Sequence, residues 1–385
     1  MTSPSAARLS PVALLLGVVL LPLVGSALAG RDMHRLFRFP PPLEIPSGYT
    51  KFSWPGAGAV LAVLAALALS WVVTFQRRPR DLCAHPSDTL TPRRAKSFPL
   101  WGQAALVWIV GWWWVAWNRG PEFASVQRYT FFPLWLGFIV AVNACTTSRT
   151  GGCLLTRAPR LWLTLFGASA VFWWIFEWLN RFVRNWHYLG VADFGPIAYA
   201  AHASLCFSTV LPAVSAVAEL LGTYPRWTDT IAAGPAWAWF GSRGTALVLV
   251  SGGACALLLT GAFPPWFYPA LWAAPLALFL GESVLSGRGG LPQEIARGDW
   301  RRAATWMVAG LICGFFWELW NWRSVAKWIY TVPSVERWQV FEMPLLGYAG
   351  YLPFGLECLL VIESLRTLDL EKRVQRLIRE NRYSP

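Results

Sequence analysis

Long apolar runs without a charged residue recur along the whole chain, and they restrict its fold more than any other feature. A helix of about 20 residues crosses the roughly 30 Å of hydrocarbon in a bilayer. Lipid offers no partner to an exposed backbone group, so these runs should be helices and not open strands. We therefore predict an all-α fold, a polytopic transmembrane helix bundle. Its ten expected spans are 10–29, 55–75, 100–117, 131–147, 161–179, 196–221, 244–262, 266–285, 303–320 and 343–365.

The distribution of charge supports this class. Charged residues make up 14% of the 385 residues, and the mean hydropathy is +0.41, whereas a soluble domain carries about 25% charged residues. All 33 Lys and Arg lie outside the expected spans. With a cytoplasmic N-terminus, 22 of them lie on the cytoplasmic side, which agrees with the positive-inside rule. We expect a multi-pass protein of the bacterial plasma (inner) membrane.

The net charge of +13 is dispersed over several loops and forms no nucleic-acid-binding motif, so we expect membrane lipid and no nucleic acid as a partner. The tail 367–385 has apolar residues on one helical face and Lys and Arg elsewhere. This pattern predicts a basic amphipathic helix on the anionic lipid of the cytoplasmic leaflet. The alternative is a solvated helix that continues the last span.

The first span is ambiguous. The stretch "VALLLGVVLLPLVGSALAG" ends in Ala27-Leu28-Ala29, which resembles a signal-peptidase site. Both interpretations leave Gly30 outside and do not change the remaining topology. We favour a retained helix.

Two tryptophan-rich stretches share one pattern of polar residues. They are "FWWIFEWLNRFVRNWHY" (172–188) and "GFFWELWNWRSVAKWIY" (314–330). In each, a glutamate is followed three residues later by an asparagine and then by W-x-Y. The corresponding residues are Glu177 and Glu318, Asn180 and Asn321, Trp186 and Trp328, and Tyr188 and Tyr330.

The same correspondence extends over three spans on each side. For example, "STVLPAVSAVAEL" (208–220) matches "GYLPFGLECLLVIESL" (350–365). We predict a parallel tandem repeat of three-helix units, related by an axis near the membrane normal. The predicted organisation is an N-terminal membrane region with three helices (1–128), a first repeat (129–221), a linking helix (222–264), a second repeat (265–366) and the tail (367–385).

Several acidic residues lie inside or at the edge of the expected spans. An ionised carboxylate at a helix centre costs roughly 2.5–3.5 kcal/mol, so such groups normally face the bundle interior and mark function. The alternative is that they join helices as structural hydrogen-bond partners. They are Glu177, Glu219, Glu282, Glu318, Glu357, Glu363 and Glu342. The predicted catalytic acids are Glu177, Glu318 and Glu357, and burial of an unpaired carboxyl group favours its neutral form.

Tryptophan is abundant, with 26 residues. The rings form either an interfacial belt or an aromatic cavity whose faces stabilise a cation or a flat apolar ligand. The predicted ligand-binding residues are Asn180, Asn321, Trp178, Trp317, Tyr188, Tyr330 and His202. His187 and His202 form either a proton relay with Glu177 or ordinary packing contacts. The seven Cys show no CxxC and the four His no HxxxH, so we expect neither a metal nor a cofactor.

The repeat resembles the lycopene cyclase domain of the integral-membrane carotenoid cyclases. Asn180 with Trp186-x-Tyr188 and Asn321 with Trp328-x-Tyr330 match that family's Asp/Asn and W-x-Y element. Pro353 with Glu357 matches its Pro-and-glutamate element loosely, and the tight Pro-x-Glu-Glu is missing. The chain is also similar to bacterial multi-spanning membrane proteins that share "FSTVLP" and "FEMPLLGY".

The resemblance implies a cyclase-like enzyme for an isoprenoid or another apolar lipid, with a protonated glutamate as general acid. The rival hypothesis is a non-enzymatic transporter or membrane assembly subunit. A cyclase-like enzyme needs a closed, dry pocket, whereas a transporter needs water access from both sides.

The charge distribution generates a topology prediction. The loop 76–98 and the tail after Arg366 hold 12 of the 33 basic residues, so both should be cytoplasmic. A membrane-impermeant maleimide should therefore label Cys83 in inverted vesicles and leave it unlabelled in intact cells. Labelling of Cys83 from outside intact cells would overturn the orientation.

Overall fold

The computed structural model describes residues 11–45, 52–77, 97–287 and 290–382, and the side chains of 13–45, 52–76, 97–287 and 290–366. The described chain is mostly helical, with two antiparallel sheets of two strands each. The predicted helical class is confirmed. Cys83 and the loop around it, on which the topology prediction depends, lie outside the described residues.

All ten expected spans contain helix. The helices at these positions are α1 (Pro11–Leu28), α3 (Trp54–Arg77), α4 (Leu100–Trp117), α5 (Phe131–Thr150), α7 (Pro159–Val183), α8 (Pro196–Phe207), α9 (Val210–Leu221), α11 (Arg243–Ala262), α13 (Ala270–Leu285), α15 (Arg301–Trp322) and α16 (Tyr351–Arg382). The shorter helices are α2 (His34–Phe37), α6 (Leu154–Arg157), α10 (Pro225–Ile231), α12 (Pro264–Phe267) and α14 (Leu291–Ala296). Single 3₁₀ turns are η2 (Pro121–Phe123), η3 (Gln127–Tyr129), η4 (Ala238–Gly241) and η5 (Leu345–Gly350).

Seven stretches of the described chain are long and apolar enough to cross a membrane. They are Trp54–Gln76, Phe131–Thr150, Pro159–Val183, Pro196–Leu221, Arg243–Ala262, Arg301–Trp322 and Leu345–Arg366. The other three expected spans are the apolar helices α1, α4 and α13, with 18, 18 and 16 residues. The chain is a multi-pass membrane protein on these grounds.

The span 196–221 is broken between α8 and α9. Pro212 has no N–H and its ring crowds the carbonyl of the residue four positions earlier, so a helix cannot continue through it undisturbed. Ser169 of α7 satisfies the backbone groups at the break: its Oγ donates to the carbonyl of Phe207 at 2.6 Å and accepts from the N–H of Leu211 at 3.0 Å. The break is therefore held by a neighbouring helix and not left open to lipid.

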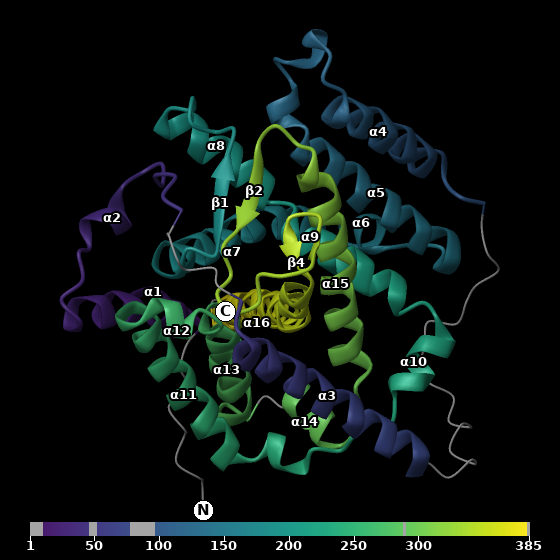
Figure 1. Cartoon of the computed structure of the whole chain (residues 1–385). Helices are drawn as coiled ribbons and strands as arrows, with labels where there is room; N and C mark the ends of the chain where they lie inside the picture. Colours follow the sequence, from purple (N-terminus) through teal and green to yellow (C-terminus); the bar gives the residue numbers. More distant parts are fainter. Residues whose placement is uncertain (1–10, 46–51, 78–96, 288–289, 383–385) are drawn as a thin grey trace, which may run out of the picture.

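The bundle is built around α9, α15 and α16. Figure 1 shows α16 end-on at the centre with the other helices around it. In the described chain α9 packs against α5, α7, α15 and α16, and α16 also packs against α13 and α15. The helix α4 flanks α5, and α11 flanks α13 in the same manner. The largest fully buried side chains are aromatic, with Trp135, Trp320, Phe176 and Phe354 among them, so the core is a network of ring contacts.

The helix α1 packs closely against α11 (Figure 1). Leu14 and Val18 lie in the main core cluster, and the Ser26 hydroxyl donates to the carbonyl of Gly261 at 3.0 Å. Glycines permit the close approach, because a Cβ on Gly261 would lie 1.8 Å from the carbonyl oxygen of Pro22. Whether α1 is retained or cleaved as a signal peptide stays a prediction.

At the other end of the chain, α16 continues without a break to Arg382. The predicted tail is therefore helical and continuous with the last span up to that residue. The side chains after Arg366 lie outside the described residues, so the amphipathic contact with anionic lipid stays a prediction.

The α1–α11 contact can be tested with a matched pair of glycines. Gly261→Ala places a methyl group against the Pro22 backbone and should destabilise the protein by about 1–3 kcal/mol. Gly252→Ala, on the same helix with no atom within 4 Å, should leave stability almost unchanged. Thermal unfolding in detergent measures both variants. Equal unfolding midpoints would mean that α1 is absent from the mature protein or does not pack on α11.

Candidate functional site

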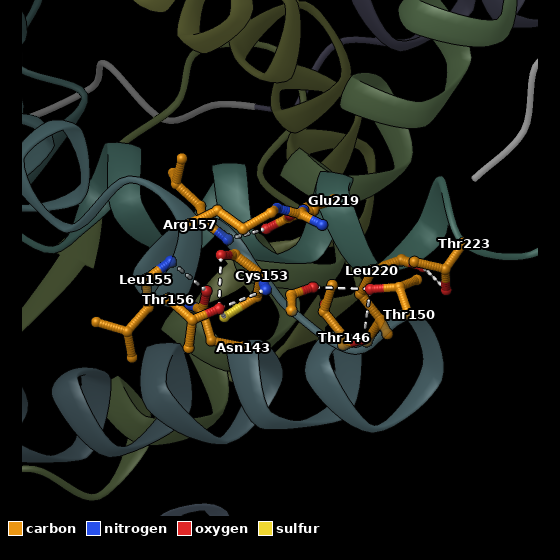
Figure 2. Close-up of polar contacts among 12 residues, drawn as sticks. Asn143, Thr146, Thr150, Cys153, Leu155, Thr156, Arg157, Glu219, Leu220 and Thr223 are labelled. Atoms are coloured by element: carbon orange, nitrogen blue, oxygen red, sulfur yellow. Dashed lines mark hydrogen bonds and ion pairs between the residues drawn. The ribbon is translucent and has the colours of Figure 1, made fainter. Parts of the chain in front are cut away.

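Three of the acidic residues are ion-paired. Glu219 pairs with Arg157, Glu363 with Arg302, and Glu342 with Lys327. Figure 2 shows the first of these: the Arg157 guanidinium and the Glu219 carboxylate lie beside α6. The other Glu219 oxygen accepts the N–H of Leu154, at the start of α6, at 2.9 Å. Glu219 and Glu363 each join two helices, as the structural alternative predicted, whereas Glu342 joins two segments outside the helices.

The remaining buried acids lie elsewhere. Glu177, Glu318 and Glu357 are 6%, 0% and 2% exposed, and Glu282 is 4% exposed. No ion pair of Glu177, Glu318 or Glu357 is present among the described residues. An unpaired buried carboxyl group is costly. The hydrogen bonds of each glutamate therefore determine whether it has a structural or a chemical role.

Two short strands connect the glutamate-bearing ends of α7 and α15. The strands β1 (Trp186–Leu189) and β2 (Lys327–Tyr330) pair antiparallel and lie side by side in Figure 1. Trp186 lies opposite Tyr330, Tyr188 opposite Trp328, and His187 opposite Ile329. Each W-x-Y is thus paired with the other about its own middle residue, which is the register that a local twofold axis produces. A second, smaller sheet, β3 (Gln339–Val340) with β4 (Met343–Pro344), follows.

The two asparagines fix the start of each strand. The amide of Asn180 donates to the carbonyl of Trp186 at 2.9 Å and accepts its N–H at 3.3 Å. The amide of Asn321 donates to the carbonyl of Trp328 at 2.7 Å and accepts its N–H at 2.8 Å. Both bonds run to the same backbone residue, so each asparagine orients a tryptophan. Asn180 also lines the second cavity described below, and the ligand-binding role of the asparagines stays a prediction.

Glu177 accepts three hydrogen bonds on one oxygen. Its Oε1 accepts from Tyr188 Oη at 2.6 Å, from Trp186 Nε1 at 2.9 Å and from Trp173 Nε1 at 3.0 Å. Two of the donors come from the W-x-Y strand and the third lies one helical turn earlier on α7. The aromatic rings are thereby oriented by a single carboxyl oxygen.

Glu318 makes a related set of bonds with one substitution. Its Oε1 accepts from Tyr330 Oη and from Tyr351 Oη, both at 2.7 Å, and Trp328 Nε1 donates to Tyr330 Oη at 2.7 Å. Tyr351 takes the place that Trp173 has beside Glu177. Gly314 leaves room for it, because a Cβ there would lie 2.3 Å from the Tyr351 ring. The second oxygen, Oε2, is buried without a hydrogen-bond partner in the described chain.

Burial raises the pKa of Tyr188 and of Tyr330 above the ordinary value of 10.0, and the neighbouring glutamate raises each further. Both hydroxyl groups therefore keep their protons near neutral pH, which makes them lasting hydrogen-bond donors to the two carboxyl groups.

The rings enclose an apolar cavity of about 120 Å³, here called the aromatic cavity. Its wall includes both W-x-Y pairs and side chains of α7, α8, α15 and α16. The main aromatic lining residues are Trp173, Trp186, Tyr188, Phe207, Trp272, Trp317, Trp328, Tyr330 and Tyr351. Neither Glu177 nor Glu318 lines this cavity. The two carboxyl groups lie one layer behind it and bind the polar ends of its rings.

Several predicted site residues do line the aromatic cavity: Trp317, Tyr188, Tyr330 and His202. His202 is bounded by Tyr129, Phe194 and Cys206, with the Cys206 Sγ at 3.8 Å, and its side chain makes no hydrogen bond to Glu177 within the described residues. Trp178 lies elsewhere: its Nε1 donates to the Val19 carbonyl on α1 at 3.0 Å. Whether these residues act on a ligand stays a prediction.

Glu357 is separate from both glutamate clusters. It lies on α16 and lines neither the aromatic cavity nor the second cavity described below. Neither carboxyl oxygen makes a well-formed hydrogen bond in the described chain. The backbone of Leu276, next to the helix-interior Pro275, is its nearest polar neighbour. The structure therefore does not bring Glu357 together with Glu177 and Glu318.

Sequence reasoning missed Trp173, Trp186, Trp328 and Tyr351 as members of the site. Trp173 was detectable, because a residue four positions before Glu177 shares its helix face. Trp186 and Trp328 were recognised as a motif, but their direction depends on strand pairing. Only the small Gly314 hinted that another ring would replace the tryptophan.

A second cavity, of about 390 Å³, lies against the opposite side of β1 and is here called the outer vestibule. It is bounded by the segment 40–44, the end of α7 and His187. Glu177 lines it, so this carboxyl group lies between the two cavities. Trp186, Tyr188, Val191 and Tyr199 border both cavities.

His187 is neutral at pH 7 in this position. Burial lowers its pKa below the ordinary value of 6.5, and the positive charge of Arg184 lowers it further. Its Nε2 lies 2.9 Å from the Thr331 hydroxyl, which joins β1 to the end of β2. This contact supports the interpretation of His187 as a packing residue of the strand pair.

No cluster of three or more His, Cys, Asp or Glu side chains with the geometry of a metal site occurs within the described residues. Comparison with known proteins identifies no family: no family model, no curated protein and no solved structure matches the chain.

The asparagine contacts can be tested through stability. Asn321→Leu leaves the Trp328 N–H and carbonyl without partners, at a cost of about 1–3 kcal/mol for each group, and should lower the thermal unfolding midpoint. Asn118→Ala removes one hydrogen bond, to Gly120, in a half-exposed loop and should cost less than about 1 kcal/mol. If Asn321→Leu unfolds at the wild-type temperature, the asparagine does not hold the strand.

Proposed function

We propose that the chain binds an apolar ligand of the isoprenoid class in the aromatic cavity and acts on it as a cyclase-like acid–base enzyme. One observation carries this proposal. The cavity is lined mainly by aromatic side chains, while the polar ends of several of these side chains are bonded to two buried glutamates. Ring faces stabilise a cation, and the hydroxyl groups of Tyr188 and Tyr330 connect the cavity to the carboxyl groups.

The size of the cavity restricts what part of a ligand enters it. An apolar cavity of about 150 Å³ holds one benzene molecule, and the aromatic cavity has about 120 Å³. It therefore suits one end group of an isoprenoid, about a single five-carbon unit, and not a whole long chain. Cyclisation joins the double bonds of two such units, so the second unit has to lie at the opening of the aromatic cavity when the ring closes.

In the proposed chemistry the proton that the glutamate gives is returned to it at the end. In the proposed step the Tyr330–Glu318 hydrogen bond is reversed: a protonated Glu318 gives its proton to Tyr330 Oη, and the Tyr330 hydroxyl proton passes to one carbon of a ligand double bond. The π electrons of the double bond form the new C–H bond and leave a carbocation on the other carbon. After ring closure by a second double bond, loss of a neighbouring proton restores the glutamate through the same hydroxyl. No oxidant, reductant or cofactor is consumed.

The repeat remains part of this proposal. The symmetric register of β1 with β2 supports it, as do the matched positions of α4 beside α5 and of α11 beside α13. These positions favour units of four helices, 100–221 and 243–366, in which the linking helix opens the second unit. The resemblance to the lycopene cyclase domain rests on the same W-x-Y elements. Like the repeat, it is a proposal.

The test combines activity with stability. Purified protein is incubated with an acyclic carotenoid, and cyclic product is measured by chromatography with absorbance detection. We expect Glu318→Gln and Tyr330→Phe to lower the rate at least about 100-fold, since a positioned acid contributes about 10²–10⁴-fold. Glu342→Gln, which alters the Lys327 ion pair outside the aromatic cavity, is the control.

The rival hypotheses give different outcomes. If the glutamates only join helices, Glu318→Gln is silent and Glu318→Leu lowers the unfolding temperature. If the wild-type protein binds no isoprenoid at all, the enzyme proposal fails and a transporter or assembly subunit takes its place.

A further inference from the structure

The outer vestibule carries a concentration of arginine that the apolar chemistry does not use. Arg35, Arg181 and Arg184 line it, the first from α2 and the other two from the end of α7. On the predicted topology, 11 basic residues lie on the outer side of the membrane, and these are three of them. Outer loops normally carry few basic residues. The presence of three arginines in the wall of one cavity therefore points to an anionic ligand.

Two carboxylates also border the outer vestibule, and they offset only part of the charge of the three arginines. Glu44 lies 3.7 Å from Arg38, which is outside the cavity wall. Glu177 attracts Arg181 electrostatically, and one of its oxygens also accepts three hydrogen bonds. His187 is neutral because of burial and the charge of Arg184. The wall therefore keeps an excess of positive charge.

Two of these arginines differ in their hydrogen bonds. Arg181 donates from Nη1 to the carbonyls of Leu36 and Arg38 at 2.9 and 2.7 Å, which anchors the loop over the cavity. The Nε of Arg35 is buried and has no hydrogen-bond partner in the described chain. A buried donor without a partner costs free energy, and guanidinium groups match the oxygens of phosphate.

The two cavities share a wall. Trp186, Tyr188, Val191 and Tyr199 border both, so a group in the outer vestibule lies one side chain away from the aromatic cavity. The outer vestibule carries three arginines in its wall, whereas aromatic side chains dominate the lining of the aromatic cavity. This order of a cationic chamber followed by an apolar one matches an amphiphile with an anionic head.

We propose that the outer vestibule is a binding site for the phosphate head of an isoprenoid amphiphile whose apolar end lies in the aromatic cavity. The inference deepens the proposed function and rests on it, because it names the ligand class as a prenyl phosphate. The Arg35 guanidinium binds the phosphate oxygens, and Arg184 adds positive charge beside it.

The experiment uses three probes and the full-length protein in detergent. Geranyl phosphate carries head and tail, geraniol carries only the tail, and inorganic phosphate carries only the head. Binding is followed by tryptophan fluorescence and by the shift of the thermal unfolding midpoint. We expect geranyl phosphate to bind at least about 10-fold more tightly than either of the other probes, since a charge-assisted hydrogen bond contributes about that factor.

Arg35→Gln is the test variant, and Arg323→Gln is its control, because Arg323 is exposed and lines neither cavity. Arg35→Gln should weaken geranyl phosphate about 10-fold and leave geraniol unchanged, while Arg323→Gln should change neither. The unfolding midpoint of each variant without ligand shows whether it is folded. An unfolded Arg35→Gln protein is replaced by Arg35→Lys, which keeps the charge, loses the bidentate geometry and should give a smaller loss.

The outcomes separate this inference from the proposed function. If geraniol and geranyl phosphate bind equally and Arg35→Gln has no effect, the phosphate site is overturned and the apolar cavity stands. If inorganic phosphate binds as tightly as geranyl phosphate, the site takes free phosphate and the amphiphile is overturned. If geraniol and geranyl phosphate both fail to bind, the proposed function falls together with this inference.

Discussion

The structure depends on hydrogen bonds between buried carboxyl groups and the polar ends of aromatic side chains. A lone carboxyl group inside a membrane protein is costly, and Glu177 and Glu318 reduce this cost by accepting tyrosine and tryptophan donors. The bonds act in both directions. They supply hydrogen-bond donors to each carboxyl group, and they also fix the positions of the rings around one cavity. The hydrogen bonds of a buried polar group thereby determine the shape of an apolar cavity.

The W-x-Y strand is what allows this arrangement to occur twice at one place. Alternate residues of a strand point to the same side, so the Trp and Tyr of each motif share a face and the middle residue takes the other. Pairing about the middle residues, His187 and Ile329, brings both motifs over a single cavity. Asn180 and Asn321 set where each strand begins. Four residue types at fixed spacing thereby determine a site between segments about 140 residues apart in sequence.

The sequence was sufficient for the helical multi-pass class and for the burial of Glu177, Glu318 and Glu357, because both follow from local patterns of charge and length. It was not sufficient to predict which side chains line the aromatic cavity and which lie behind them. We expected Glu177 and Glu318 in the cavity wall, whereas the tyrosines lie in front of them. We expected Trp178 in the wall of the aromatic cavity. Trp173 lies there instead, and it shares the helix face of Glu177. The pairing of β1 with β2 and the approach of Tyr351 are long-range contacts, and no local signal specifies them.

The two glutamates are not equivalent in their access to protons. Glu177 borders the outer vestibule as well as the aromatic layer, so it can exchange a proton on the vestibule side without passing a ligand. Glu318 is fully buried and lines neither cavity; its bonded neighbours are Tyr330 and Tyr351, which do line the aromatic cavity. A proton on Glu318 therefore leaves and returns through the ligand's own cavity. In the proposed chemistry this favours Glu318 for a step that gives a proton and takes one back, and Glu177 for restoring protons lost to water.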